Sequence, residues 1–199
     1  MQARYSKAHW RPLRFAGSMP ARQQKHAVIL HTNGGGAAVF DYFSRPDNKD
    51  DIASHFQVFN DGRIEQYIGC DKVAYAAYAS NGWAIQVETE DDGHPERPWT
   101  KAQLAAIIGI CKWAGCPAKP LAESPSDGVG WHAQYHSWNL HSHSCPGAVR
   151  IAQIEHVIIP ALKPQPKPTK VVKVVPGRWA KFKAGHKKLW SWLKGSDRA

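Results

Sequence analysis

Hydrophobic positions in the first half of the chain predict several short strands. Residues 26–32 form an apolar, β-branched run followed by glycines, which is typical of a buried strand opening into a loop. Residues 54–59 and 63–68 alternate in polarity around an Asn-Asp-Gly turn, which predicts a β-hairpin. Residues 83–90 alternate in the same way and predict another strand, while 37–43 fit one short helix.

The second half of the chain predicts two longer helices. Thr100 and Gln103 fit a capping box at the start of the first helix, which is expected to end near Gly115. The second helix is expected over 148–159 and is stopped by Pro160. The apolar positions expected to face the core are Leu104, Ile107, Ile108 and Cys111 in the first helix, and Ile151, Ile154, Val157 and Ile158 in the second.

This mixture of strands and helices predicts an α/β fold with a mixed central β-sheet flanked by helices. Residues 1–25 are interpreted as an N-terminal arm packed on the domain, and 26–162 as the domain itself. Within it, the Pro/Ser/Gly-rich segment 117–130 is expected to be a loop. Residues 163–176 are interpreted as a Pro/Lys linker, and 177–199 as a basic amphipathic tail.

The net charge of +10 comes from the C-terminal part of the chain alone. Residues 163–199 hold eleven Lys and Arg and one acidic residue, so the remaining residues 1–162 are neutral. Such a tail attracts polyanions, and its tryptophans suit a lipid interface. We expect it to bind an anionic cell wall or membrane surface; a passive packed terminus and a nucleic-acid contact are the alternatives.

Two classes of protein are disfavoured by composition. No apolar run is long enough to span a membrane, and residues 1–14 lack the apolar region of a standard secretory signal, so export by that route is not expected. Four cysteines are too few for a disulfide-rich scaffold, and because no export signal is visible, a reducing compartment is expected. Cys111 and Cys116 are interpreted as two buried thiols, with pairing under oxidation as the alternative.

Histidines are concentrated in one segment of the second half. Five of the eleven lie within 25 residues, and Cys145 lies among them. Imidazole nitrogen and thiolate sulfur are the donors that zinc prefers, and three protein ligands leave one position open for catalysis. The segment therefore indicates a metal site, although a His-rich loop can also be exposed and inert.

Several motifs appear in an order that is typical of one enzyme family. His31 ends a strand, the hairpin contains Ser-His-Phe and Asp-Gly, Glu88 ends a second strand, and Cys145 opens a Cys-Pro-Gly triplet. Over about residues 26–160 the chain resembles the zinc-dependent N-acetylmuramoyl-L-alanine amidases. That family includes phage endolysins and shares its fold with peptidoglycan recognition proteins. The stretches 86–90 and 128–132 are most similar to endolysins of phages that infect actinobacteria.

The resemblance implies a set of metal ligands. His31, His132 and Cys145 fall on the family's Zn²⁺ ligands. His136 is the alternative to His132, because its spacing to Cys145 is closer to that of shorter members. We favour His132, since a strand end holds a side chain more rigidly than a polar loop.

The resemblance also implies two catalytic residues. Glu88 falls on the family's carboxylate, which exchanges a proton with water and the leaving amine; a solvated position in an acidic run is the alternative. His143 falls where many members carry Lys, Thr or Arg to stabilise the oxyanion, and an imidazole N–H can do the same. Ser54 stands where some members carry Tyr, and His55 is the alternative helper there.

The implied activity is hydrolysis of the amide between N-acetylmuramic acid and L-alanine in peptidoglycan. We expect a monomeric phage endolysin that lyses the host cell, present in the host cytoplasm before lysis and acting on the cell wall. Four aromatic residues near the implied site either stack on the substrate or pack in the core. They are Trp83, Trp131, Tyr135 and Trp138.

Two other functions compete with the enzyme. A peptidoglycan-binding module of the same fold would recognise the wall without cutting it, but such proteins typically lose the cysteine ligand that is present here as Cys145. A nucleic-acid-binding protein would act through its basic tail, but the neutral domain lacks the broad positive surface that phosphates attract. We expect no specific nucleic-acid partner.

Overall fold

The protein is described by a computed structural model that covers residues 3–35 and 39–164. The chain divides into two compact units, Met1–Pro164 and Gln165–Ala199, and the first of these contains the described residues. Most of the expected linker 163–176 and the whole of the expected tail 177–199 therefore lie outside the described residues.

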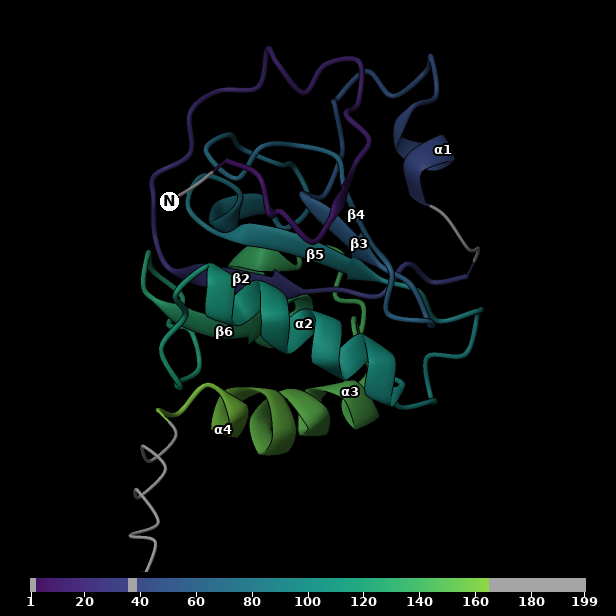
Figure 1. The fold of residues 1–199 in the computed structure, drawn as a ribbon. Coiled ribbons are helices and arrows are strands. Elements are labelled where there is room, and N and C mark those ends of the chain that lie inside the picture. Colours follow the sequence, from purple (N-terminus) through teal and green to yellow (C-terminus); the bar gives the residue numbers. More distant parts are fainter. Residues whose placement is uncertain (1–2, 36–38, 165–199) are drawn as a thin grey trace, which may run out of the picture. The chain divides into compact units, whose positions relative to one another are not determined.

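A six-stranded mixed sheet forms the centre of the domain, in the order β1-β4-β3-β5-β2-β6 (Figure 1). Only β3 and β4 pair antiparallel, as the predicted hairpin, whereas the other neighbours run parallel. The strands are β1 (His9–Trp10), β2 (Ala27–Leu30), β3 (Phe56–Val58), β4 (Ile64–Gln66), β5 (Ile85–Thr89) and β6 (Gly128–Trp131). The expected α/β fold class is confirmed.

Helices lie on both sides of the sheet (Figure 1). The helix α2 (Lys101–Trp113) and the C-terminal helical segment cover one side, and the short helix α1 (Val39–Phe43) lies on the other. That C-terminal segment consists of α3 (Ala148–Gln153), the π-helical η4 (Ile154–Ile158) and α4 (Ile159–Ala161). Three 3₁₀ turns complete the described residues: η1 (Tyr78–Ser80), η2 (His132–Gln134) and η3 (His136–Trp138).

The main hydrophobic core lies between the sheet and the helical segments α2, η4 and α4. Side chains of β2 and β5 at alternating positions enter this core, where they meet apolar residues of the helices. They are Val28, Leu30, Ile85 and Val87 from the strands, and Ile107, Ile110, Ile154 and Ile158 from the helices. The intervening side chains of these strands therefore point to the opposite face of the sheet, where polar groups are found.

The capping box predicted for α2 is present. Thr100 Oγ1 accepts a hydrogen bond from the backbone N–H of Gln103, and the Gln103 side chain accepts one from the backbone N–H of Thr100. The helix ends at Trp113, close to the expected position, and Gly115 two residues later has a φ of +74°, which favours glycine. The buried face of the helix differs from the predicted one in three residues. Ile110, which was not predicted to face the core, is fully buried, while Leu104 and Ile108, which were predicted to face it, are only partly buried.

The expectation that Pro160 stops the last helix is wrong. The backbone of η4 switches to wider π-type turns, and the N–H of Ile159 bonds the carbonyl of Ile154 before helical turns continue to Ala161. Proline has no N–H and its ring clashes with the carbonyl of an ordinary α-helical turn, which the wider turn relieves. Val157, expected in the core, is 41% exposed.

Two segments are more regular than their sequence indicated. The N-terminal arm contributes β1, which pairs parallel with β4, and it buries Leu13, Phe15 and Met19. Segment 117–130 was expected to be a loop throughout, but its last three residues belong to β6. Glycines in β6 weakened the strand signal.

No helix in residues 3–35 and 39–164 has both the length and the apolar character needed to cross a membrane. All four cysteines carry free thiols, and Cys111 and Cys116 are buried in the core as interpreted from the sequence.

The capping box allows a direct test of the α2 boundary. Thr100→Ala is expected to lower the free energy of unfolding by about 1 kcal/mol, because the first turn loses its side-chain acceptor. Thr100→Ser keeps the hydroxyl and is expected to retain most of that stability. Urea titration of the full chain measures both; equal stability of the Ala and Ser variants would contradict this role.

A buried histidine predicts how stability depends on pH. His55 is fully buried; its Nδ1 accepts from the Gln86 N–H at 2.9 Å, and its Nε2 donates to the Lys72 carbonyl at 2.9 Å. Burial lowers the pKa of His55 to about 3. Below the ordinary histidine pKa of about 6.5, His55 therefore binds a proton in the unfolded chain but not in the folded chain.

Stability contributed by neutral His55 is thus present above pH 6.5 and is lost as the pH falls toward 3. Between pH 7 and pH 5 this loss amounts to at most about 2 kcal/mol. His55→Gln cannot take up a proton, so its free energy of unfolding is expected to fall less over that interval. Urea titrations at both pH values test this, and an identical loss in both proteins would refute it.

Candidate functional site

The register of three parallel strands brings polar residues to one edge of the sheet. Leu30, the last residue of β2, pairs with Val87 of β5 on one side and with Trp131 of β6 on the other. The residues that follow these three are His31, Glu88 and His132. Paired positions in a sheet point to the same face, so these side chains form one row on the face opposite the main core.

His31 is held in one orientation by the strand beside it. Its Nε2 donates to Gln86 Oε1 at 2.9 Å, so Nδ1 carries a lone pair and faces the open side of the site. Burial lowers the pKa of His31 to about 4, and the hydrogen bond to Gln86, which raises the pKa, opposes this effect only in part. The imidazole is therefore neutral at neutral pH, which is the form that binds metal ions.

His132 begins η2 directly after β6 and is buried against His31. The two Nδ1 atoms lie 3.1 Å apart, and the ring centroids lie 4.6 Å apart. Burial and the neighbouring imidazoles lower the pKa of His132 to about 2, so it too is neutral. Two neutral imidazoles that approach through the same nitrogen need a proton or a cation between them.

Cys145 reaches the same place from a loop more than a hundred residues along the chain from His31. Its Sγ accepts a hydrogen bond from the backbone N–H of Thr32 at 3.2 Å. Burial raises the pKa of the thiol, so a metal ion that binds here must displace its proton. The glycine of the triplet is required: Gly147 has a φ of +97°, and a Cβ would lie 2.8 Å from the Pro95 carbonyl oxygen.

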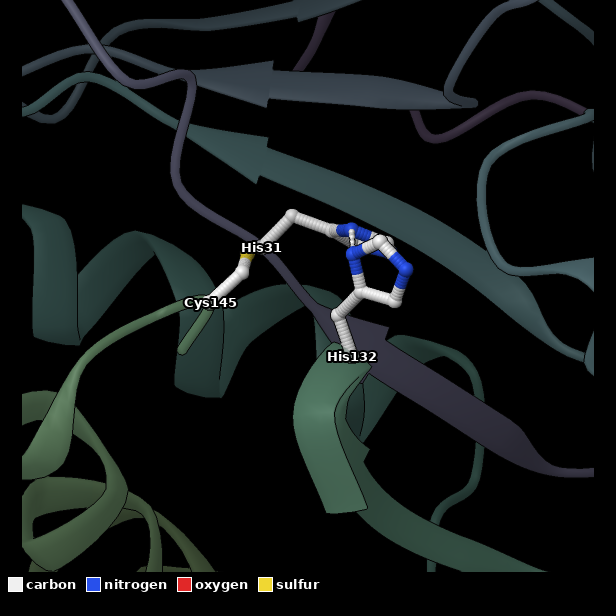
Figure 2. Close-up of side chains that lie close together, drawn as sticks. All are labelled: His31, His132 and Cys145. Atoms are coloured by element: carbon white, nitrogen blue, oxygen red, sulfur yellow. Dashed lines mark hydrogen bonds between the residues drawn. The ribbon is translucent and has the colours of Figure 1, made fainter. Parts of the chain in front are cut away.

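One ligand atom from each of His31, His132 and Cys145 lies within 4.8 Å of the other two. Figure 2 shows the two imidazole rings tilted against each other, with their Nδ1 atoms close together and the cysteine entering from its own loop. Two imidazole nitrogens and a sulfur are the donor set that suits zinc. His136, the alternative ligand, is exposed on η3 and outside this cluster.

Glu88 lies beside the cluster. Its Oε1 is 3.8 Å from His31 Nδ1, and its Oε2 is buried without a hydrogen-bond partner among the described residues. Burial, with a smaller contribution from Asp91, raises the pKa of Glu88 to about 8. A buried polar atom left unpaired is costly, so this carboxyl group is arranged for a ligand or substrate rather than for stability.

His143 stands at the opening of the site. Its ring meets that of His132 edge-on, with centroids 4.4 Å apart, and it lines the same cleft. Burial and the proximity of His141 lower the pKa of His143. The side chain is therefore a neutral imidazole that can offer one N–H to a group in the cleft.

A cleft of about 500 Å³ opens above the three donors. One wall is apolar and comes from α1 and its surroundings: Val39, Tyr42, Phe43 and Ile52. The start of α1 is tied to the sheet, because the backbone N–H of Val39 donates to Gln57 Oε1 at 3.0 Å. Sequence patterns did not single out this wall, since three of its residues are ordinary members of the short helix α1 and Ile52 lies outside that helix.

The four aromatic residues expected near the site do not line the cleft. Trp83, Trp138 and Tyr135 pack together with Leu121 in a second apolar cluster, and Trp131 packs against the main core. The sequence left open whether these residues stack on the substrate or pack in the core, and the structure shows that they pack in the core.

The possible helpers Ser54 and His55 are also structural. Ser54 is buried and donates to the Phe56 carbonyl, and His55 bonds backbone groups of Gln86 and Lys72. Neither lines the cleft. A second polar group at that point of the hairpin is therefore not available to a substrate in this cleft.

Solved structures with a similar fold come from enzymes and recognition proteins. N-acetylmuramoyl-L-alanine amidase LysC from Clostridium intestinale superposes with a TM-score of 0.57 at 14% identity, over 76% of this chain and 95% of that one. Drosophila PGRP-LB superposes with a TM-score of 0.55 at 18% identity, over 74% and 94%. A search of curated proteins finds no match.

A family profile described as N-acetylmuramoyl-L-alanine amidase matches residues 20–148. This range is more than half of the chain and contains all three clustered donors, Glu88 and His143. The chain belongs to the N-acetylmuramoyl-L-alanine amidase family.

Proposed function

We propose that this protein is a zinc-dependent amidase that hydrolyses the bond between N-acetylmuramic acid and L-alanine in peptidoglycan. The observation that carries the proposal is the convergence of His31, His132 and Cys145 beside an unpaired Glu88 in an open cleft. Membership of the amidase family supports the same conclusion.

The residues of the cluster suit zinc. Both imidazoles are neutral and present Nδ1 toward each other, and the thiol is close to a backbone N–H that favours its ionised form. When bound, zinc supplies a Lewis acid that polarises a carbonyl group and acidifies water. His31, His132 and Cys145 would hold it and leave the side toward the cleft open.

Glu88 is proposed as the general base and acid. As water attacks the amide carbonyl, its oxygen forms a bond to carbon while Glu88 takes one of its protons. The carbon–nitrogen bond then breaks, and Glu88 returns the proton to the leaving amine of alanine. Its raised pKa suits both transfers, because a group that titrates near the working pH can accept and release a proton.

His143 is proposed to stabilise the oxyanion formed on the carbonyl oxygen. It lines the cleft at the edge of the His132 ring and is neutral, so it acts through an N–H donor rather than a charge. The apolar wall around Tyr42 and Phe43 would contact the less polar parts of the substrate.

We also propose that the protein serves as a phage endolysin that lyses the host cell, present in the host cytoplasm before lysis and acting on the cell wall. Its basic tail is proposed to bind an anionic wall or membrane surface. The order of motifs supports the first role, and the charge of residues 163–199 supports the second.

The metal ligands can be identified by substitution. His132→Ala and Cys145→Ala are each expected to lose bound zinc, since two donors hold the ion far less tightly than three. His136→Ala is the matched control and is expected to keep about one zinc per chain. Metal analysis of the purified proteins measures the bound zinc. Loss of zinc from the His136 variant alone would contradict the assignment of His132 and Cys145 as ligands.

The role of Glu88 is separable from metal binding. Glu88→Gln is expected to keep zinc and to lose about 10²- to 10⁴-fold in the rate of amide cleavage, because the group that moves the proton is absent. Glu90→Gln is the matched control: it is the same change two residues further along, at a carboxylate that bonds the Asn60 N–H.

The reaction itself is measured on purified peptidoglycan. Mass spectrometry should find peptides with a new alanine amino terminus, and a chelator should stop their release. Binding to peptidoglycan with no new amino terminus would support a recognition module instead, and unchanged cleavage by Glu88→Gln would contradict the assigned base.

A further inference from the structure

Two opposite charges are buried next to the proposed zinc site. The side chain of Arg150 is 2% exposed and that of Asp91 is not exposed, and Arg150 Nη1 lies 3.7 Å from Asp91 Oδ2. Burying charges costs free energy unless hydrogen bonds and a partner compensate. Neither residue lines the cleft, so the pair must act through its neighbours.

Arg150 joins its own helix to two loops. Its Nη1 donates to the carbonyl oxygens of Pro146 at 3.2 Å and Pro95 at 3.4 Å, and its Nη2 donates to that of His94 at 3.1 Å. Pro146 directly follows Cys145. The planar guanidinium group therefore fixes the backbone next to the sulfur ligand in relation to the loop that follows β5.

Asp91 holds the chain that follows His31. Its carboxylate accepts hydrogen bonds from Thr32 Oγ1 at 2.7 Å and from the Gly35 N–H at 2.8 Å. Arg150 Nη1 also donates to Thr32 Oγ1, at 3.4 Å. Thr32 is the residue whose backbone N–H donates to Cys145 Sγ, so it connects both sides of the network.

We propose that Arg150 and Asp91 are positioning residues that hold Cys145 and the segment after His31 at the separation that zinc requires. This inference rests on the proposed function. The network touches residues adjacent to two of the three ligands, one from a strand end and one from a loop, and no strand pairing joins these two segments directly. Groups that orient metal ligands in this way typically change metal affinity by about 10- to 100-fold.

A second buried arginine in the same domain provides the matched control. Arg22 is 4% exposed, and its guanidinium donates to the carbonyl oxygens of Cys70 and Trp83, among others. These acceptors do not line the cleft. Replacement of either arginine removes a buried charge and its backbone hydrogen bonds, but only Arg150 is bonded to the metal-binding segments.

The test measures the dissociation constant of Zn²⁺ for the full chain, by competition with a fluorescent chelator. Arg150→Met is expected to weaken zinc binding about 10- to 100-fold. Arg150→Lys is expected to weaken it by less, since lysine keeps the positive charge but lacks the planar set of N–H donors of the guanidinium group. Arg22→Met is expected to lower the thermal midpoint of the metal-free protein while leaving the zinc affinity unchanged.

Equal zinc affinity of the wild type and Arg150→Met, or equal weakening by Arg22→Met, would overturn the inference. If Arg150→Met does not fold, Thr32→Val replaces it, because this variant removes the shared hydroxyl and keeps the backbone N–H to Cys145; unchanged affinity there overturns the inference as well. A folded wild-type chain that binds no zinc would instead contradict the proposed function, on which the inference depends.

Discussion

Parallel pairing of β2 with both β5 and β6 is the constraint on which the site depends. It places the residues after Leu30, Val87 and Trp131 in one row, and the alternation of side chains turns that row away from the helical core. His31, Glu88 and His132 therefore meet, although the last of them is 101 residues from the first. A slip of one residue in either strand would point these groups into the apolar layer instead.

Burial then gives each of these groups its chemical character. Desolvation keeps both imidazoles neutral and raises the pKa of Glu88, so the site holds electron-pair donors and a titratable carboxyl group rather than fixed charges. The fixed charges are those of the buried pair Asp91 and Arg150. This pair does not line the cleft and forms hydrogen bonds with backbone groups of three loops. The fold thus separates the groups that face the cleft from those that hold them in place.

Much of this arrangement was accessible from the sequence. Alternation predicted β5 and the hairpin, Thr100 and Gln103 predicted the start of α2, and the donors His31, His132 and Cys145 were named from the family resemblance. The apolar wall around Tyr42 and the buried Arg150 were not predicted. Their roles depend on which loops meet in space, and local patterns carry no information about contacts between residues more than fifty positions apart. The π-helical turn before Pro160 was missed for a related reason, because local propensity favours a stop there.

The metal site is tested most directly by locating zinc in crystals of the full chain that are grown with zinc, with diffraction recorded at the zinc absorption edge. We expect one anomalous peak, from a zinc ion bound by Nδ1 of His31, Nδ1 of His132 and Sγ of Cys145, at about 2.0 to 2.3 Å from each atom. A zinc peak bound by other residues, with no peak between these three atoms, would contradict this site.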